Sequence, residues 1–435
     1  MTWDYDGWIV LIGVLVAVAC ALPGTWLVVR GMGLMGDAIS HAVLPGIAVA
    51  FLVSGTRDSG WMFAGAAVAG VTAAVLTQVV HRWGGIERGA AMGIVFTTLF
   101  AMGLLLIVQT ADSVDLDAGC VLHGILEMAP YDVIDVGGWT MPRIVPPLIG
   151  AVVVNIIVMV ILYKELLMAS FDPALSNTLG FPAGALQLLV MVLTAMTCVA
   201  CFEAVGSIIT VSLIVAPAAT ALLLAQRMIN VLVLAAVIGA ASAVLGHVAA
   251  VKVPTAILGL SSETSPAGTM AVMAAVIFAI TAMVAPRRGV LSRNLSMRRR
   301  MARVAIEDAL GLLFRLHERG EPASDVEVRQ LLESDVRVGA RRVRPVLDGL
   351  IRKRLAGVSD GCWTLTPLGR DAAAMLVRAH RLWETYLAGR SDIPSSHLHA
   401  AAERLEHATD STLLEALGSE VNDSVDPHGR PIPPA

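Results

Sequence analysis

Residues 8–29 read WIVLIGVLVAVACALPGTWLVV, a stretch that contains no charged side chain. A helix needs about 20 apolar residues to cross the hydrocarbon core of a bilayer, so this stretch predicts a transmembrane helix. The whole chain is 56% hydrophobic and only 15% charged, whereas soluble proteins carry about 25% charged residues. This composition excludes a single soluble domain. Comparable apolar stretches predict about nine membrane spans in an all-α polytopic domain: 8–29, 39–54, 61–81, 90–110, 146–163, 185–203, 207–225, 229–250 and 267–285. Two of them, 39–54 and 207–225, are short and could be half-helices, so the count is eight or nine.

The charged residues divide the chain into two parts. Residues 1–286 hold 8 Lys/Arg and 15 Asp/Glu, whereas residues 287–435 hold 23 Lys/Arg and 20 Asp/Glu. The first part is therefore a nearly uncharged apolar body, and the second has the composition of a soluble domain. The basic stretch 287–302 between them is typical of a linker that contacts lipid headgroups, and a nucleic-acid-binding arm is the alternative.

The placement of basic residues predicts the orientation of the spans. Cytoplasmic loops carry an excess of Lys and Arg. With nine spans and the N-terminus outside, the inner connections hold Arg30, Arg82, Arg88, Lys164, Arg227 and the run Arg287–Arg303. The outer connections hold only Arg57, Arg143 and Lys252. We therefore expect a multi-pass membrane protein with its C-terminal domain in the cytoplasm.

Ionisable side chains inside an apolar span are rare and tend to be functional. The richest case is the stretch Gly36–Gly46, in which Asp37 and His41 are four residues apart and share one helical face. A carboxylate and an imidazole suit a transient site for a divalent metal, so we expect both to line a transport pathway. A structural hydrogen bond between them is the alternative. His247, near the outer end of another span, faces the same pathway or the membrane interface.

A polar segment, Phe171–Pro182, interrupts the apolar pattern on the inner side. Asp172 and Pro173 can start a short helix, and Gly180 can end it. Such a helix could press on a partner protein, and a simple loop is the alternative.

The chain has no ATP-binding motif of its own. A P-loop requires GxxxxGK[ST], but the three lysines, at positions 164, 252 and 353, are followed by Glu, Val and Arg. We therefore expect no enzyme here, and any ATP hydrolysis that drives transport to occur on a separate chain.

Several motifs together resemble the bacterial zinc/manganese/iron ABC-transporter permeases, the ABC-3 family. They cover residues 8–286 in the family order and lie at Arg30–Gly46, Ala91–Ile94, Phe171–Gly180 and Val205–Ala221. The resemblance implies a homodimeric permease of the bacterial inner membrane that imports divalent manganese, iron or zinc. It also implies two partners, a cytoplasmic ABC ATPase and an extracytoplasmic metal-binding protein. Asp172, Pro173 and Gly180 would belong to the helix that couples the permease to the ATPase.

The soluble part predicts an α+β winged helix-turn-helix domain over residues 303–370. Helical patterns at about 304–318, 324–333 and 341–354 are followed by a hairpin with Asp360-Gly361 at its turn. Ser324 is the expected N-cap of the second helix. Arginines at and near the third helix could contact DNA phosphates, and a protein-docking module is the alternative: Arg337, Arg341, Arg342 and Arg344.

Residues 371–435 predict further helices that carry metal-ligand residue types. His380 and Glu384 are spaced i, i+4, and His399, Glu403, Glu406 and His407 follow on a second helix. A histidine and carboxylate set suits Mn²⁺, Fe²⁺ or Zn²⁺, and salt bridges with Arg381 and Arg404 are the alternative.

The order of these elements is similar to that of the diphtheria-toxin-repressor/manganese-repressor family over residues 303–434. The similarity is strongest at 378–384, 398–407 and 426–433. It implies a metal-sensing dimer that binds operator DNA. Mn²⁺ or Fe²⁺ is the expected metal, and Zn²⁺ is the alternative. Glu403 stands where iron-type members carry Cys, which indicates a manganese-like site. The implied ligands are His380, Glu403, Glu406, His407 and the N-terminal Asp308, with Glu384 and His399 in a second site.

Two positions depart from that family. Gly311 stands where the manganese type has a Glu ligand, which puts a complete binuclear site in doubt. Pro345 falls at or within the third helix, where a proline removes a backbone hydrogen bond, and this puts standard DNA readout in doubt.

The leading hypothesis is a metal-ion ABC permease fused to a metal-sensing, DNA-binding domain, with residues 371–435 for metal binding and dimerisation. In one alternative, the C-terminal domain gates its own permease by trans-inhibition without DNA. In a second, the permease carries metal chelates or vitamins. In a third, the chain is a membrane-anchored regulator that transports nothing.

Overall fold

The computed structural model describes residues 3–55, 59–110, 126–136, 139–257, 264–286, 288–321, 323–334, 336, 339–359, 361–390, 395–421 and 424–434. The chain divides into two compact units, Met1–Ser292 and Arg293–Ala435.

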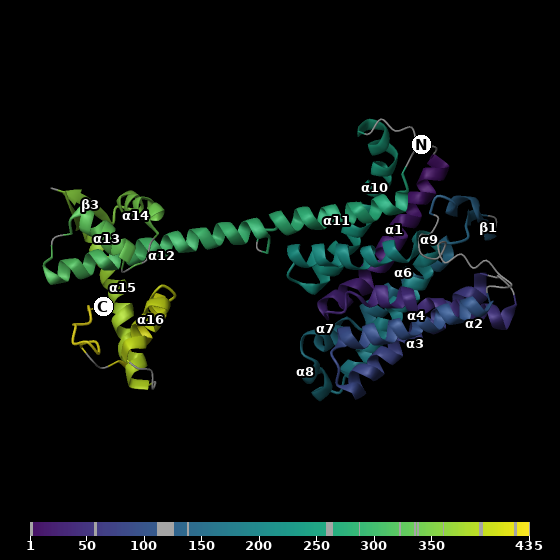
Figure 1. The fold of residues 1–435 in the computed structure, drawn as a ribbon, viewed down its shortest axis with the longest axis horizontal. Coiled ribbons are helices and arrows are strands. Elements are labelled where there is room, and N and C mark those ends of the chain that lie inside the picture. The colour runs from purple at the N-terminus through teal and green to yellow at the C-terminus, as the bar shows by residue number, and fades with distance from the viewer. Residues whose placement is uncertain are drawn as a thin grey trace. The chain divides into compact units, whose positions relative to one another are not determined.

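The first unit consists mainly of apolar helices (Figure 1). α1 packs against α9 and α10, and α2 packs against α3 and α4. One short antiparallel hairpin, β1–β2, pairs Val133 with Pro142 and was not predicted from the sequence. The elements are α1 Trp3–Val29, α2 Met35–Ser54, α3 Ser59–Gly84, α4 Arg88–Thr110, η1 Ala129–Tyr131, β1 Val133–Val136, β2 Trp139–Pro142, α6 Val145–Ile161, α7 Tyr163–Phe171, α8 Pro173–Thr178, α9 Ala183–Leu224, α10 Met228–Ile257 and α11 Pro266–Val284.

The expected count of nine spans is not confirmed. Within the described residues, seven helices are long and apolar enough to cross a membrane, or eight if α6 and α7, bent by 74°, form one span. The predicted span 207–225 corresponds to the second half of α9, Ile209–Leu224, because Gly206 breaks α9 with a φ of 75°. This half-helix is only about 24 Å long, short of the roughly 30 Å hydrocarbon core.

Small residues let these helices approach closely. A Cβ added to Gly46 on α2 would lie 2.2 Å from the carbonyl oxygen of Gly65 on α3. A Cβ on Gly24 of α1 would lie 2.3 Å from the carbonyl oxygen of Ile214 on α9. Helices in lipid associate through such backbone contacts, because apolar side chains gain little by leaving a hydrocarbon solvent. The buried Asn155 adds a polar link, since it donates to Ala19 O and Thr197 Oγ1 at 3.2 and 2.9 Å.

The second unit follows the order of elements predicted from the sequence. Leu310, Leu313 and Leu347 belong to its buried core with Trp363 of the hairpin. Ser324 caps α13, accepting from Glu327 N at 3.3 Å. The winged-helix assignment itself stays a prediction. The elements are α12 Val290–Arg319, α13 Asp325–Ser334, α14 Ala340–Arg352, β3 Ala356–Ser359, β4 Cys362–Leu365, α15 Pro367–Arg390, α16 Ser395–Glu406 and α17 Ser411–Glu420.

Candidate metal sites

The first candidate pair lies on α2 of the membrane unit. His41 Nε2 is 3.7 Å from Asp37 Oδ1, as expected for residues one helical turn apart. Two aromatic rings of α4 pack on the imidazole, with ring centroids 5.6 Å away for Phe96 and 5.1 Å for Phe100. The rings fix the imidazole beside a half-exposed carboxylate, an arrangement that can offer one nitrogen and one oxygen ligand to a divalent cation.

His247 forms a separate pair. It lies on α10 and is 1% exposed, and its Nε2 is 3.2 Å from Oδ1 of Asp6 on α1. The expected pathway residues thus belong to two pairs on different helices, Asp37 with His41 and Asp6 with His247. Asp6 was not predicted from the sequence, because it precedes the first apolar run and has no helical spacing to a histidine.

The segment Phe171–Pro182 contains a short helix, α8, rather than a loop. Asp172 Oδ1 accepts from Leu175 N at 2.9 Å and caps it, and Pro173 occupies its first position. After the helix, Gly180 has a φ of 88°, a conformation that favours glycine. Four large apolar side chains of this segment are exposed and could contact a partner: Phe171, Leu175, Leu179 and Phe181.

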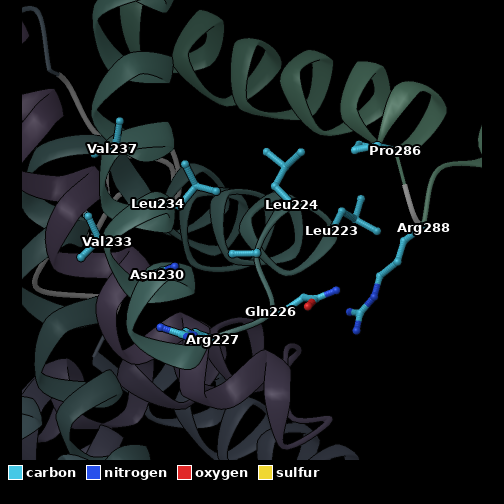
Figure 2. Close-up of a pocket in the computed structure, with 11 residues that line it drawn as sticks. Leu223, Leu224, Gln226, Arg227, Asn230, Val233, Leu234, Val237, Pro286 and Arg288 are labelled. Atoms are coloured by element: carbon cyan, nitrogen blue, oxygen red, sulfur yellow. The ribbon is translucent and has the colours of Figure 1, made fainter.

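A cavity of about 680 Å³ in the membrane unit lies apart from these pairs (Figure 2). Leu224, Leu234 and Val237 form its apolar wall, and Arg227 and Arg288 lie at its polar edge. Guanidinium groups repel a divalent cation, so this cavity does not suit a metal ion.

In the second unit, α15 and α16 bring together the first of two three-residue clusters. His380 and Glu384 come from α15, and His399 comes from α16. Glu384 Oε1 is 3.1 Å from His380 Nε2 and 2.9 Å from His399 Nδ1, and the two imidazole nitrogens are 2.9 Å apart. One carboxylate and two imidazoles can therefore converge on one point.

The second cluster joins α12 to the end of α16. His407 Nε2 is 2.9 Å from Asp308 Oδ1 and 3.5 Å from Glu406 Oε1. The other oxygen of Glu406 is 2.5 Å from Nδ1 of His380, so Glu406 connects the two clusters. Glu307 Oε2 lies 2.9 Å from His407 Nδ1. This residue was not predicted from the sequence, in which only its position next to Asp308 pointed to a role in the cluster.

The carboxylates hold His380 and His407 in their protonated form. Burial disfavours a charged imidazole, but hydrogen bonds and attraction from Glu384 and Glu406 outweigh it and raise the pKa of His380 to about 9. Burial likewise opposes the charge on His407, but Asp308, Glu406 and Glu307 raise its pKa to about 9. A metal ion would replace these protons, because metal ligands bind in their deprotonated form.

Two positions at which the resemblance would place a metal ligand, Glu403 and Gly311, belong to neither cluster. Glu403 lines the same cavity as Asp308 and His380, but its side chain is exposed and belongs to neither cluster. Beside Gly311, the space that a Cβ would enter is bordered by Arg315 Nη1 at 3.6 Å. A cationic group thus lies where the resemblance would place a further carboxylate ligand.

The expected DNA-contacting arginines lie on α14, except Arg337, which is outside the described residues. Arg341, Arg342 and Arg344 are exposed. Pro345 lies inside this helix, as the sequence suggested.

Comparison with known proteins supports both halves of this description. Residues 5–285 match the model of the ABC 3 transport family. Residues 366–434 match the metal binding and dimerisation domain of the iron dependent repressors.

Three known proteins illustrate the similarity of the membrane unit. The manganese transport system membrane protein MntD of Bacillus subtilis is 38% identical over 67% of this chain and 96% of its own length. The zinc transport system membrane protein TroD of Treponema pallidum is 33% identical over 78% of this chain and 91% of its own length. The solved structure of PsaBC from Streptococcus pneumoniae in complex with Fab has a TM-score of 0.52 at 28% identity, over 67% of this chain and 94% of the other. The chain therefore belongs to the ABC 3 transport family, as a multi-pass membrane permease that carries a repressor-type metal binding and dimerisation domain at its C-terminal end.

Proposed function

We propose that this chain is the permease subunit of an ABC importer for Mn²⁺ or Zn²⁺ and that its C-terminal domain senses the same class of ion. The cargo is taken from the relatives, which are manganese and zinc transport proteins by name. Iron, which the sequence also suggested, stays a prediction. The observation that carries the sensing role is the pair of carboxylate and imidazole clusters joined by Glu406.

In the membrane unit, Asp37 and His41 would contact the ion during its passage, and His247 would contact it together with Asp6. A carboxylate with an imidazole is a ligand set of intermediate hardness, suited to Mn²⁺ and Zn²⁺ alike. The exposed apolar side chains of the segment 171–182 would dock on a separate cytoplasmic ATPase, with Asp172, Pro173 and Gly180 fixing the shape of this segment. An extracytoplasmic metal-binding protein would deliver the ion to a homodimer of the permease. We infer from the distribution of basic residues that the N-terminus lies outside and the C-terminal domain in the cytoplasm.

In the C-terminal domain, a metal would be held by His380, Glu384 and His399 in one cluster and by Asp308, Glu406 and His407 in the other. The described members of both clusters are oxygen and nitrogen donors without a thiol, which suits Mn²⁺ better than a soft-ligand zinc site. Glu403 would join as a ligand by rotating inward from the cavity wall.

The regulatory output that we propose is metal-dependent binding of operator DNA. The exposed arginines of α14 support it, because guanidinium groups contact DNA phosphates. A gel shift of the full chain in detergent with its own upstream DNA, with and without Mn²⁺, tests this output. A metal-dependent shift supports it. If no shift is seen and transport falls when the clusters of the C-terminal domain bind metal, trans-inhibition is favoured instead.

Metal accumulation tests the transport function. Cells that produce the chain with its ATPase and binding protein should accumulate Mn²⁺ or Zn²⁺ above cells that lack the chain. Accumulation of a metal chelate or vitamin but not of the free ion would overturn the assignment, as would equal accumulation of every metal in both strains.

A further inference from the structure

The largest cavity described above, of about 680 Å³, joins an apolar wall to a basic edge within the membrane unit (Figure 2). It lies among the end of α9, the first turns of α10 and the segment that follows α11. Both α10 and α11 are long and apolar enough to span a membrane. The cavity is therefore at the ends of membrane-spanning helices, where hydrocarbon gives way to headgroups and water.

The apolar wall follows one face of α10. Asn230, Val233, Leu234 and Val237 are spaced i, i+3, i+4 and i+7, which places them on the same side of the helix. Val233 is 59% exposed and Val237 is 56% exposed, and Leu224 at the end of α9 is 47% exposed. Lipid tails are as apolar as such side chains, so this wall suits contact with an acyl chain.

Two arginines form the basic edge of the cavity. In Figure 2, Arg227 and Arg288 lie below Leu224 and Leu234. Arg288 Nη1 donates to the carbonyl oxygen of Leu222 at 3.0 Å, and Arg227 has no side-chain hydrogen bond or ion pair with any described residue. None of the described residues that line the cavity is acidic. Both positive charges are therefore available to an anion from outside the chain.

The length of the wall matches one leaflet of a bilayer. Val237 lies ten residues after Arg227, which is about 15 Å along a helix axis. Half of a hydrocarbon core of about 30 Å is also about 15 Å. A lipid whose headgroup contacts the arginines would therefore have an acyl chain long enough to cover the wall as far as Val237.

The sign of the charge favours an anionic headgroup. The distribution of basic residues assigns this end of the helices to the cytoplasmic side. Anionic lipids give the cytoplasmic leaflet a negative surface potential, and basic pockets between transmembrane helices on that side bind their headgroups. Guanidinium groups bind phosphate with two parallel hydrogen bonds each.

We propose that this cavity binds one anionic phospholipid, with its phosphate at Arg227 and Arg288 and one acyl chain along Leu234 and Val237. A free phosphate would leave the apolar wall uncovered, and a zwitterionic lipid would bring its own cation close to two guanidinium groups. The bound lipid would also support the second half of α9, whose end at Leu224 belongs to the wall. The site does not depend on the proposed transport of metal ions.

Native mass spectrometry of the delipidated full chain in a non-ionic detergent tests the site by titration with phosphatidylglycerol. We expect saturable binding of one lipid per chain, about tenfold or more tighter than binding of phosphatidylcholine with the same acyl chains, because contacts between opposite net charges are gained. Glycerol 3-phosphate carries the phosphate without acyl chains and should not bind at the same concentrations.

Two variants separate the basic edge from the apolar wall. Arg227→Gln combined with Arg288→Gln should remove the preference for phosphatidylglycerol. Val237→Trp should weaken the binding of both lipids, because the larger side chain occupies the space of the acyl chain. Arg227, Arg288 and Val237 are exposed, so the melting temperature of the lipid-free chain should not change. Arg82→Gln is the matched control, since Arg82 is an exposed arginine in the last turn of α3 and outside this cavity.

Equal affinity for the two lipids would overturn the proposal, as would phosphatidylglycerol binding in either cavity variant that equals binding by the Arg82→Gln chain. Glycerol 3-phosphate that binds as tightly as the lipid would also overturn it, because the cavity would then be a site for free phosphate. The titration contains no metal ion, so each of these results leaves the proposed transport function untouched.

Discussion

Glu406 is the residue whose replacement should most damage metal binding in the C-terminal domain. Its two oxygens face different clusters, with Oε2 2.5 Å from His380 Nδ1 and Oε1 3.5 Å from His407 Nε2. The substitution Glu406→Gln keeps the size of the side chain but removes the negative charge and replaces one accepting oxygen with a donating NH₂ group. Both clusters should therefore lose affinity together.

The size of the effect follows from these contacts. Replacing a group that only supports a metal ligand typically weakens metal binding about 10- to 100-fold. Glu406 contacts both clusters directly and is buried, so we expect the upper end, about 100-fold or roughly 3 kcal/mol. Glu403→Gln should cost less, because Glu403 is exposed and outside both clusters.

Calorimetric titration of the metal-free full chain with Mn²⁺ measures these losses. Glu415→Gln is the control, since Glu415 is an exposed carboxylate on α17 and its loss should leave Mn²⁺ affinity unchanged. A Glu406→Gln chain that melts normally and binds Mn²⁺ as tightly as the unmodified chain would refute the bridging role of this carboxylate.

Three further predictions concern pH, coupling and DNA. The raised pKa values of His380 and His407, about 9 against an ordinary 6.5, stabilise the metal-free fold fully below about pH 6.5. This stabilisation is lost as the pH rises through 9, so the melting temperature of the metal-free chain should fall across that window. An unchanged melting temperature would contradict the pairing of these histidines with the carboxylates of the clusters. Gly180→Val should reduce the ATP hydrolysis that accompanies transport in the assembled complex, because a β-branched residue is strained at φ 88°. ATP hydrolysis equal to that of the unmodified complex would mean that the α8 segment does not couple the permease to the ATPase. Arg341→Ala with Arg344→Ala should weaken DNA binding and lower the salt slope by about 2, and an unaltered slope would place the DNA contacts elsewhere.

The sequence predicted the membrane spans well where length and apolar character alone decide them. The stretch 8–29 lies within α1, and 61–81 lies within α3. It also separated 185–203 from 207–225, on either side of the break at Gly206, but it did not predict the 74° bend between α6 and α7. Only packing shows that Gly206 adopts a positive φ and leaves a half-helix after it.

The six members of the two clusters were among the residues predicted from the sequence, but that set also included Glu403, which belongs to neither cluster, and the arrangement was not predicted. The i, i+4 spacing placed His380 and Glu384 on one face, and the structure brings their polar atoms to 3.1 Å. Spacing along one helix cannot show which carboxylate connects two helices, so the position of Glu406 between the clusters required the packing of α15 on α16.

Metal uptake by variants of the α2 pair tests the central claim, that this chain itself provides the path of the ion, most directly. Cells with the assembled transporter would carry the unmodified chain, Asp37→Ala or His41→Ala, and accumulation of radioactive manganese and zinc would be measured at equal protein levels. Our account predicts that either substitution abolishes most of the accumulation. Accumulation equal to that of the unmodified chain in both variants would contradict it.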